Sequence, residues 1–246
     1  MKALAVIPAR FRSSRFPGKP LVEISGTPMV VRVARIAAVA VGVENVLVAT
    51  EDERIRRVVE DAGFQAVITS DKCLTGTDRL AEVARLHAAD VYLNVQGDEP
   101  MLDPQAIRQV LAAVTAKPET IFNAMAPLAF GEDPSNVNIP KVVATESGRL
   151  LYMSRAPVPG FKDVANRPSR YMKQVCVYAF SPAHLRAFSE FGRKSVLECS
   201  EDIEILRFLD LGFEVQMVEV ESGSLAVDVP SDVALVEDAM RARGIE

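Results

Sequence analysis

The stretch ALAVIPARFRSSRFPGKP, residues 3–20, joins an apolar run to a basic loop. The apolar part, ALAVIPA, has the length and composition of a fully buried strand. The following Gly, Pro and Ser residues hinder helix continuation and predict a loop. Apolar residues at helical spacing come next, in PMVVRVARIAAVA (28–40). A buried strand, a loop and a helix in this order are typical of the first unit of an α/β sheet.

The same alternation continues to about residue 120. Further strands are predicted at 45–50, 65–69 and 91–96, and further helices at 52–63, 76–88 and 103–114. In the last of these helices, Asp103 suits the N-cap and Pro104 the first helical position. We therefore expect an α/β fold with a mostly parallel sheet and helices on both faces.

The second half of the chain is less regular. It predicts a strand pair in 141–154, a polar loop at 157–171, strands at 174–180 and 214–220, a helix at 199–212 and a terminal helix from Ser231. Internal repeats and low-complexity linkers are absent from the sequence. We expect one domain over residues 1–246, with an elaborated second half.

Composition narrows the class of protein. The chain has 246 residues, of which 49% are hydrophobic and 25% charged, and its net charge is −5. These values are ordinary for a soluble globular protein and disfavour binding to nucleic acid or to an anionic membrane. Three widely spaced cysteines predict neither a disulfide framework nor a zinc site. We expect a cytoplasmic protein that does not associate with membranes.

The first 22 residues carry five basic side chains and no acidic one, although the whole chain is acidic. Four of the five lie in the loop after the first strand: Arg10, Arg12, Arg15 and Lys19. Such a loop can surround phosphate oxygens, with arginine forks giving bidentate contacts. The alternative is a solvated basic loop. GxxxxGK[ST] is absent, so the loop is not of the Walker A type.

Two carboxylates lie at predicted strand ends. Asp98 follows the strand in VYLNVQGDEP, where Gly97 permits a sharp turn, and Asp228 lies in LAVDVP. Carboxylates beside a triphosphate are typical Mg²⁺ ligands. The alternative roles are a turn cap for Asp98 and a helix cap for Asp228. In CLTGTDRL, Thr75 or Thr77 suits the N-cap of the next helix, whose free N–H groups could meet a base or ribose.

The motifs taken together resemble one enzyme family. IPARFRSSRFPGKPL is similar to the opening of CMP-KDO synthetases, the 3-deoxy-manno-octulosonate cytidylyltransferases. The resemblance continues through GTPMVVRV, TGTDRLAEV, LNVQGDEPMLDP, LYMSRAPVP and AVDVPSDVALVE, in order and over nearly the whole chain. It implies a Rossmann-like nucleotidyltransferase fold with a smaller dimerisation part, and a homodimer. It also implies Mg²⁺-dependent transfer of CMP from CTP to the sugar acid KDO, with release of pyrophosphate, for lipopolysaccharide synthesis.

The resemblance also implies roles for residues on the nucleotide side. Lys19, Arg15, Asp98 and Asp228 would be catalytic, and Asp98 and Asp228 would hold the metal ion. The residues implied in nucleotide binding are Pro8, Ala9, Arg10, Arg15, Lys19, Thr75, Gly76 and Thr77.

On the acceptor side, a sugar acid needs a cation for its carboxylate and polar groups for its hydroxyls. The implied residues are Gln96, Arg155, Gln174, Tyr178, Glu198, Glu201 and Glu204. The three glutamates share one stripe of the predicted helix, where Arg207 could pair with them; a solvated acidic face is the alternative. Many family members have histidine at the position of Gln174.

That difference lies on the acceptor side, so it leaves cytidylyl transfer intact, but more than one sugar acid could then be the acceptor. The alternative acceptors are related 2-keto-3-deoxy acids, such as amino-KDO or a nonulosonic acid. A non-catalytic nucleotide-binding module is a further alternative, which Lys19, Asp98 and Asp228 disfavour.

Overall fold

The computed structural model describes residues 1–13, 16–129, 131–221 and 223–245, and within them nine strands form one sheet. Seven strands follow the order β11-β7-β10-β6-β1-β4-β5. Their bounds are β1 (Ala3–Ala9), β4 (Val46–Thr50), β5 (Gln65–Ile68), β6 (Val91–Val95), β7 (Ile121–Pro127), β10 (Met172–Phe180) and β11 (Val215–Glu219). The hairpin of β8 (Lys141–Ala144) and β9 (Leu150–Ser154) joins through β8 to β10.

The sheet is mostly parallel, which confirms the prediction. β1 is parallel to β4 and β6, β4 to β5, and β7 to β11. β10 runs antiparallel to both β6 and β7, with a register shift between Val175 and Tyr178. The carboxyl end of β6 therefore lies beside the middle of β10, and that of β1 lies next to it on the other side of β6.

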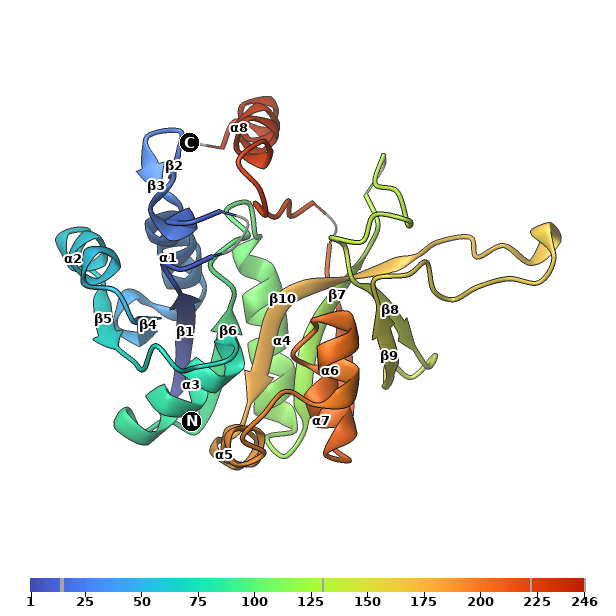
Figure 1. Cartoon of the computed structure of the whole chain (residues 1–246), viewed down its shortest axis with the longest axis horizontal. Coiled ribbons are helices and arrows are strands. Elements are labelled where there is room, and N and C mark those ends of the chain that lie inside the picture. Colours follow the sequence, from blue (N-terminus) through green and yellow to red (C-terminus); the bar gives the residue numbers. More distant parts are fainter. Residues whose placement is uncertain (14–15, 130, 222, 246) are drawn as a thin grey trace.

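Helices cover both faces of this sheet (Figure 1). Successive residues of a strand point to opposite faces, so Ala5 and Ile7 of β1 enter one core, and Leu4 and Val6 enter the other. The first core takes α1 (Met29–Val41), α2 (Glu53–Asp61) and α4 (Pro104–Ala116). The second takes α3 (Gly76–Leu86), α5 (Pro182–Glu190) and α7 (Leu206–Asp210), with α6 (Val196–Glu201) at its edge.

A smaller third cluster anchors the terminal helix α8 (Asp232–Arg243). Val236 and Met240 of α8 pack with Ile24 and Met29. Ile24 belongs to a short hairpin of β2 (Glu23–Ile24) and β3 (Thr27–Pro28). The cluster holds the C-terminal segment against the loop that follows β1.

Several predicted helix ends are confirmed. Asp103 is the N-cap of α4, with Pro104 at the first helical position, and Asp52 caps α2 through a hydrogen bond from the N–H of Arg54. The predicted helix at 199–212, however, is wrong as one element. Asp202 adopts a left-handed conformation (φ 51°) and ends α6, and α7 begins only at Leu206.

The sequence analysis missed the short hairpin of β2 and β3 and two longer elements, β7 and α5. β7 is a central strand, but IFNAMAP contains Asn and Ala, which are depleted in strands, and it lacks alternation. Six of its seven residues are buried, so the tertiary environment overrides the weak propensity.

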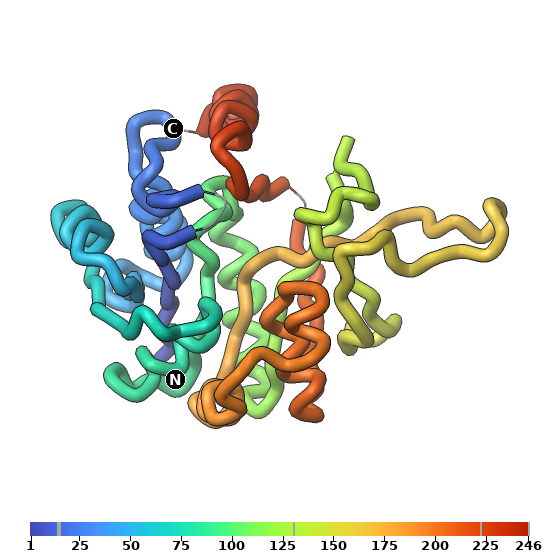
Figure 2. Tube along the Cα trace, viewed as in Figure 1, coloured from blue at the N-terminus to red at the C-terminus, as the bar shows by residue number. Residues whose placement is uncertain are grey.

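The polar loop at 157–171 is confirmed and forms an arm that projects from the sheet (Figure 2). It contains a short 3-10 turn, Val164–Asn166, and exposes Phe161 and Val164.

Among the helices described, none is long and apolar enough to cross a membrane.

Candidate active site

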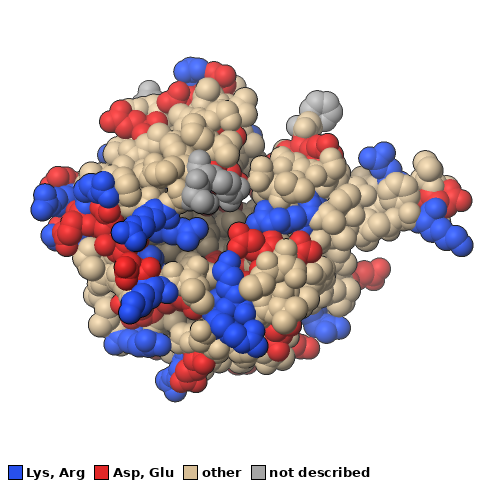
Figure 3. Space-filling model, in the orientation of Figure 1, with Lys and Arg blue, Asp and Glu red and all other residues tan. Residues whose placement is uncertain are grey.

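A cavity of about 370 Å³ opens where the carboxyl ends of β1 and β6 meet β10. Segments distant in sequence line it: the loop after β1, the start of α3, the loop after β6, and residues of β10, α6 and the C-terminal segment. On this face of the molecule, basic and acidic side chains gather around a central hollow (Figure 3). Ligands of open α/β sheets bind at such strand ends.

One cation and two carboxylates meet at one end of the cavity. Lys19 Nζ lies 3.1 Å from Asp98 Oδ2 and 3.9 Å from Asp228 Oδ1, and donates a hydrogen bond to the carbonyl of Val227 (2.9 Å). Gly18 enables the preceding turn, because its φ of 74° is left-handed. This turn places the ammonium of Lys19 close to the carboxylates of Asp98 and Asp228.

Asp228 reaches this cluster differently from the prediction. It was expected at a strand end, but β11 ends at Glu219, and Asp228 lies beyond it in a segment that is neither helix nor strand. A hydrogen bond from the N–H of Val227 to the carbonyl of Asp98 (2.9 Å) brings the two segments together. The carboxylate of Asp232 accepts from the N–H groups of Asp228 and Val229 and so ties this segment to the start of α8, while the role of Asp228 as metal ligand or helix cap stays a prediction.

The two carboxylates fit a divalent cation. Asp98 Oδ1 is buried and accepts no hydrogen bond from the described residues, so one oxygen of this pair is available as a ligand. Lys19 already shows that a positive charge is stable between Asp98 and Asp228. Two carboxylates, completed by phosphate oxygens and water, make a typical Mg²⁺ environment. The described residues contain no group of three or more His, Cys, Asp or Glu that could hold a metal ion alone.

The nucleotide side is built on the N-terminus of α3. Thr75 caps the helix by accepting from the N–H of Asp78, while Asp78 accepts from the N–H of Thr75. A Cβ on Gly76 would lie 3.0 Å from Gln96 Nε2 and 3.1 Å from Pro8 Cγ, so glycine permits the close approach of three segments. A helix N-terminus with free N–H groups favours an anionic or polar ligand.

The structure places most of the predicted nucleotide-binding residues on the cavity wall: Pro8, Ala9, Arg10, Lys19, Thr75 and Gly76. Thr77 is instead fully buried, and its N–H donates to Glu204 Oε2 (2.9 Å). Arg15 lies outside the described residues. The roles of all these residues remain predictions.

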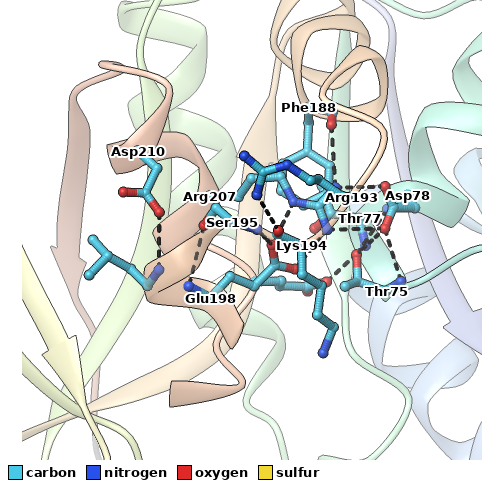
Figure 4. A network of polar contacts seen from close by, with 12 residues as sticks. Thr75, Thr77, Asp78, Phe188, Arg193, Lys194, Ser195, Glu198, Arg207 and Asp210 are labelled. Carbon is cyan, nitrogen blue, oxygen red and sulfur yellow. Dashed lines mark hydrogen bonds and ion pairs between the residues drawn. The ribbon is translucent and has the colours of Figure 1, made fainter. Parts of the chain in front are cut away.

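The acidic residues of the acceptor side do not form one helical stripe. Glu198 is 1% exposed, and it accepts two 2.7 Å hydrogen bonds from the guanidinium of Arg207 (Figure 4). Arg207 also donates to Asp78, the residue that completes the capping box of α3 with Thr75. The pairing of Arg207 with a glutamate was predicted, and its consequence is that α6 and α7 are joined to the start of α3.

Glu201 and Arg155 each form hydrogen bonds with the segment that carries the other. Glu201 accepts from the N–H of Arg155 (2.8 Å) and from the hydroxyls of Ser154 (2.7 Å) and Tyr152 (3.3 Å). Burial opposes its ionisation, but these hydrogen bonds outweigh burial and hold the pKa of Glu201 below its ordinary value. The Arg155 guanidinium donates to the carbonyls of Val137, Glu201 and Asp202, so its donors are shared with the protein itself.

Glu204 lies beyond the end of α6 and connects the nucleotide and acceptor sides. It accepts from Gln96 Nε2 (2.6 Å), from Asn94 Nδ2 (3.3 Å) and from the N–H of Thr77 (2.9 Å). Burial raises the pKa of Glu204, and the hydrogen bonds oppose that shift.

β10 supplies the remaining wall of the acceptor side. Gln174 and Tyr178 line the cavity, as predicted, and both are largely buried. Lys173 and Glu132 also line it and form a 2.5 Å ion pair, which the sequence analysis missed. A charged residue inside an otherwise apolar strand, as in MKQVCVYAF, was the available signal, because a buried charge needs a partner.

Glu99 serves the structure of this site. It accepts from the N–H of Cys176 (2.8 Å) and from the hydroxyl of Ser224 (2.5 Å). Burial raises its pKa, and the hydrogen bonds only partly counter this. Glu99 thus fastens the loop that carries Asp98 to β10 and to the C-terminal segment.

A family model described as "Cytidylyltransferase" matches residues 4–216. The chain belongs to the cytidylyltransferase family. It is 39% identical to the 3-deoxy-manno-octulosonate cytidylyltransferase of Geobacter metallireducens, over 98% of each chain. It is 34% identical to the mitochondrial 3-deoxy-manno-octulosonate cytidylyltransferase of Arabidopsis thaliana, over 99% of this chain and 85% of the relative.

Solved structures agree with this membership. A structure of CMP:2-keto-3-deoxy-manno-octonic acid synthetase in complex with CTP superposes with a TM-score of 0.90. Its sequence is 35% identical, and the match covers 99% of this chain and 100% of that one. The inositol-1-phosphate CTP transferase from T. maritima, at 17% identity and a TM-score of 0.69, shares the fold. The predicted fold class and family are therefore confirmed.

Proposed function

We propose that this protein transfers CMP from CTP to 3-deoxy-manno-octulosonate, giving CMP-KDO and pyrophosphate, for lipopolysaccharide synthesis. The observation that carries the proposal is the convergence of Lys19, Asp98 and Asp228 beside the N-terminus of α3. It is supported by full-length similarity to proteins named for this activity. In the reaction the anomeric 2-hydroxyl oxygen bonds to the α-phosphorus as the bond to pyrophosphate breaks, and the hydroxyl proton is released.

Some residues of the chain would bind the cation and the nucleoside, and others would stabilise the charge on the phosphates. Asp98 and Asp228 would hold a divalent cation, which we infer to be Mg²⁺. When bound, such a cation supplies positive charge beside the phosphates and lowers the pKa of the attacking hydroxyl. Lys19, with Arg10 and Arg15 of the same loop, would stabilise charge on the phosphates and on the leaving group. The start of α3 would bind the nucleoside.

Release of pyrophosphate from CTP, with KDO and Mg²⁺, tests the function directly. We expect Asp98→Asn and Asp228→Asn each to lower kcat at least about 10²-fold, because each removes a negative ligand while keeping its shape. Removal of divalent cations by a chelator should abolish turnover, and added Mg²⁺ should restore it.

Asp90→Asn is the matched control, because Asp90 is exposed and its carboxylate accepts only from the N–H of Lys2 among the hydrogen bonds described. It should keep turnover near that of the wild type. Normal turnover in a folded Asp98→Asn protein would remove Asp98 from the mechanism. Absence of pyrophosphate release with every ketosugar acid would reject the function, in favour of a nucleotide-binding module.

We also propose that the protein acts as a cytoplasmic homodimer. The projecting arm supports this, because it exposes Phe161 (44%) and Val164 (78%). Apolar side chains on a projecting segment are typical of an interface. Molar mass in solution, measured by light scattering, tests the assembly.

A further inference from the structure

Asn123 is a buried polar residue that the mechanism above does not use. It lies on β7, is 0% exposed, and faces the register shift of β10 between Val175 and Tyr178. A buried amide costs free energy unless its donors and acceptor are satisfied. Its partners therefore indicate what the side chain does.

The amide nitrogen of Asn123 is fully committed. Nδ2 donates to the carbonyl oxygens of Val175 (2.9 Å) and Val177 (2.9 Å). An amide nitrogen carries two hydrogens, and carbonyls can only accept, so these contacts fix which end of the Asn123 amide is which. The oxygen Oδ1 must then face the opposite way, as an acceptor.

That acceptor orients the side chain of Gln174. Gln174 Nε2 donates to Asn123 Oδ1 at 3.0 Å. Because Asn123 cannot rotate its amide without losing two hydrogen bonds, Gln174 must keep its nitrogen toward Asn123. Gln174 is 8% exposed and lines the cavity, and none of the described residues donates a hydrogen bond to its Oε1. Gln174 therefore presents its amide oxygen, Oε1, to the cavity.

We infer that Asn123 is a positioning residue that makes Gln174 a hydrogen-bond acceptor toward the sugar acid. This inference rests on the proposed function. Its consequence is specificity: the group opposite Gln174 Oε1 must donate, as a hydroxyl or an ammonium does. An ether or a fluorine at that place would set an acceptor against an acceptor, and a site built for a donor rejects an analogue that lacks one.

A purely structural role for Asn123 predicts a different result. Asn123 also fills the register shift of β10, where Cys176 bonds the loop of Asp98 through Gln96 and Glu99. If holding this backbone were its only role, its loss would impair turnover of every acceptor alike, and would alter the KM for CTP. Positioning of Gln174 instead predicts a change at one group of the acceptor.

The experiment measures kcat/KM, at saturating CTP, for KDO and for analogues in which one hydroxyl at a time, other than the anomeric 2-hydroxyl that reacts, is replaced by amino, methoxy or fluorine. In the wild type we expect one position where methoxy and fluorine lower kcat/KM at least about tenfold while amino is accepted. In Gln174→Met and in Asn123→Ala, discrimination at that position should fall to within about threefold, while discrimination at the other positions persists. Asn45→Ala is the control, because the Asn45 amide likewise donates to a backbone carbonyl, that of Val41.

Each other outcome contradicts the inference. A wild type that tolerates methoxy at every position would overturn it, as would unchanged discrimination in both variants. Uniform loss for all acceptors in Asn123→Ala, with discrimination kept, would assign Asn123 to the backbone alone. If Asn123→Ala does not fold, Gln174→Met and Asn123→Ser carry the test. Absence of turnover of KDO and all analogues by the wild type would instead reject the proposed function.

Discussion

At the scale of single residues, the site combines one positive charge, on Lys19, with two negative charges, on Asp98 and Asp228. Lys19 is 17% exposed and neutralises part of the charge on Asp98 and Asp228. Without the lysine, two partly buried carboxylates would repel each other. The lysine therefore offsets the repulsion between the two carboxylates.

Lys19→Met should therefore affect catalysis more than binding. We expect kcat to fall about 10²-fold or more, because the positive charge beside the leaving group is lost, while the KM for CTP rises only several-fold. Steady-state kinetics of pyrophosphate release give both numbers. Arg12→Ala, an exposed cation of the same loop, should change kcat much less. Equal and small effects of both variants would favour a solvated basic loop.

At the scale of elements, the six-residue helix α6 is too short to be stable alone and is fixed at both ends. Ser195 and Glu198 form a capping box at its start, and Glu198 is bonded to Arg207 of α7. At its end, Glu201 bonds β9 and the N–H of Arg155. Tertiary contacts therefore position the acceptor side, where sequence periodicity alone predicted one continuous helix.

Glu201→Gln should destabilise the protein in a pH-dependent way. Because hydrogen bonds lower the folded-state pKa of Glu201, its ionised form stabilises the fold above the ordinary glutamate pKa of about 4.3. That stabilisation disappears as pH falls through the lower folded-state value. We expect a loss of about 1–3 kcal/mol in the free energy of unfolding at pH 7, shrinking toward acid.

Denaturant unfolding of both proteins between pH 3 and pH 7 measures this difference, with the pH values chosen about the glutamate pKa. Glu146→Gln is the control, because Glu146 is exposed in the turn between β8 and β9. It should leave the free energy of unfolding nearly unchanged. A difference for Glu201→Gln that stays constant with pH would contradict the cause given for its low pKa.

At the scale of the whole molecule, two hydrophobic cores share one sheet. Ile107 of α4 belongs to the core on one face and Phe208 of α7 to the core on the other, and both are fully buried. The same strands, β1 and β6 among them, contribute side chains to both cores. Because both cores pack on the same strands, the loss of either core would expose one face of strands on which the other core depends.

We therefore predict a single cooperative unfolding transition, as for one domain over residues 1–246. Ile107→Ala should lower the free energy of unfolding by about 2–5 kcal/mol and Phe208→Ala by about 3–5 kcal/mol. In each variant the whole transition should shift, by circular dichroism and by calorimetry together. Two separate transitions, of which each variant moves only one, would show two independently folding units.

Much of this could be predicted from the sequence, because it depends on local patterns. Apolar runs and helical spacing gave the strands and helices of the first half, and Asp103 with Pro104 gave the start of α4. Five basic residues without an acid among the first 22 drew attention to the basic loop after β1, and Gly97 beside Asp98 marked the turn after β6. Motifs in order along the chain gave the family.

Only the tertiary structure decided which groups meet. The broken helix at Asp202, the central strand β7 and the antiparallel course of β10 depend on packing between distant segments, which local propensity does not encode. The same holds for Asp228, which a backbone hydrogen bond from its neighbour Val227 brings beside Asp98. It holds too for Asn123, which accepts a hydrogen bond from Gln174, a residue 51 positions away on β10. Hydrogen-bond geometry across the sheet, which appears only on folding, determines the polarity of that site.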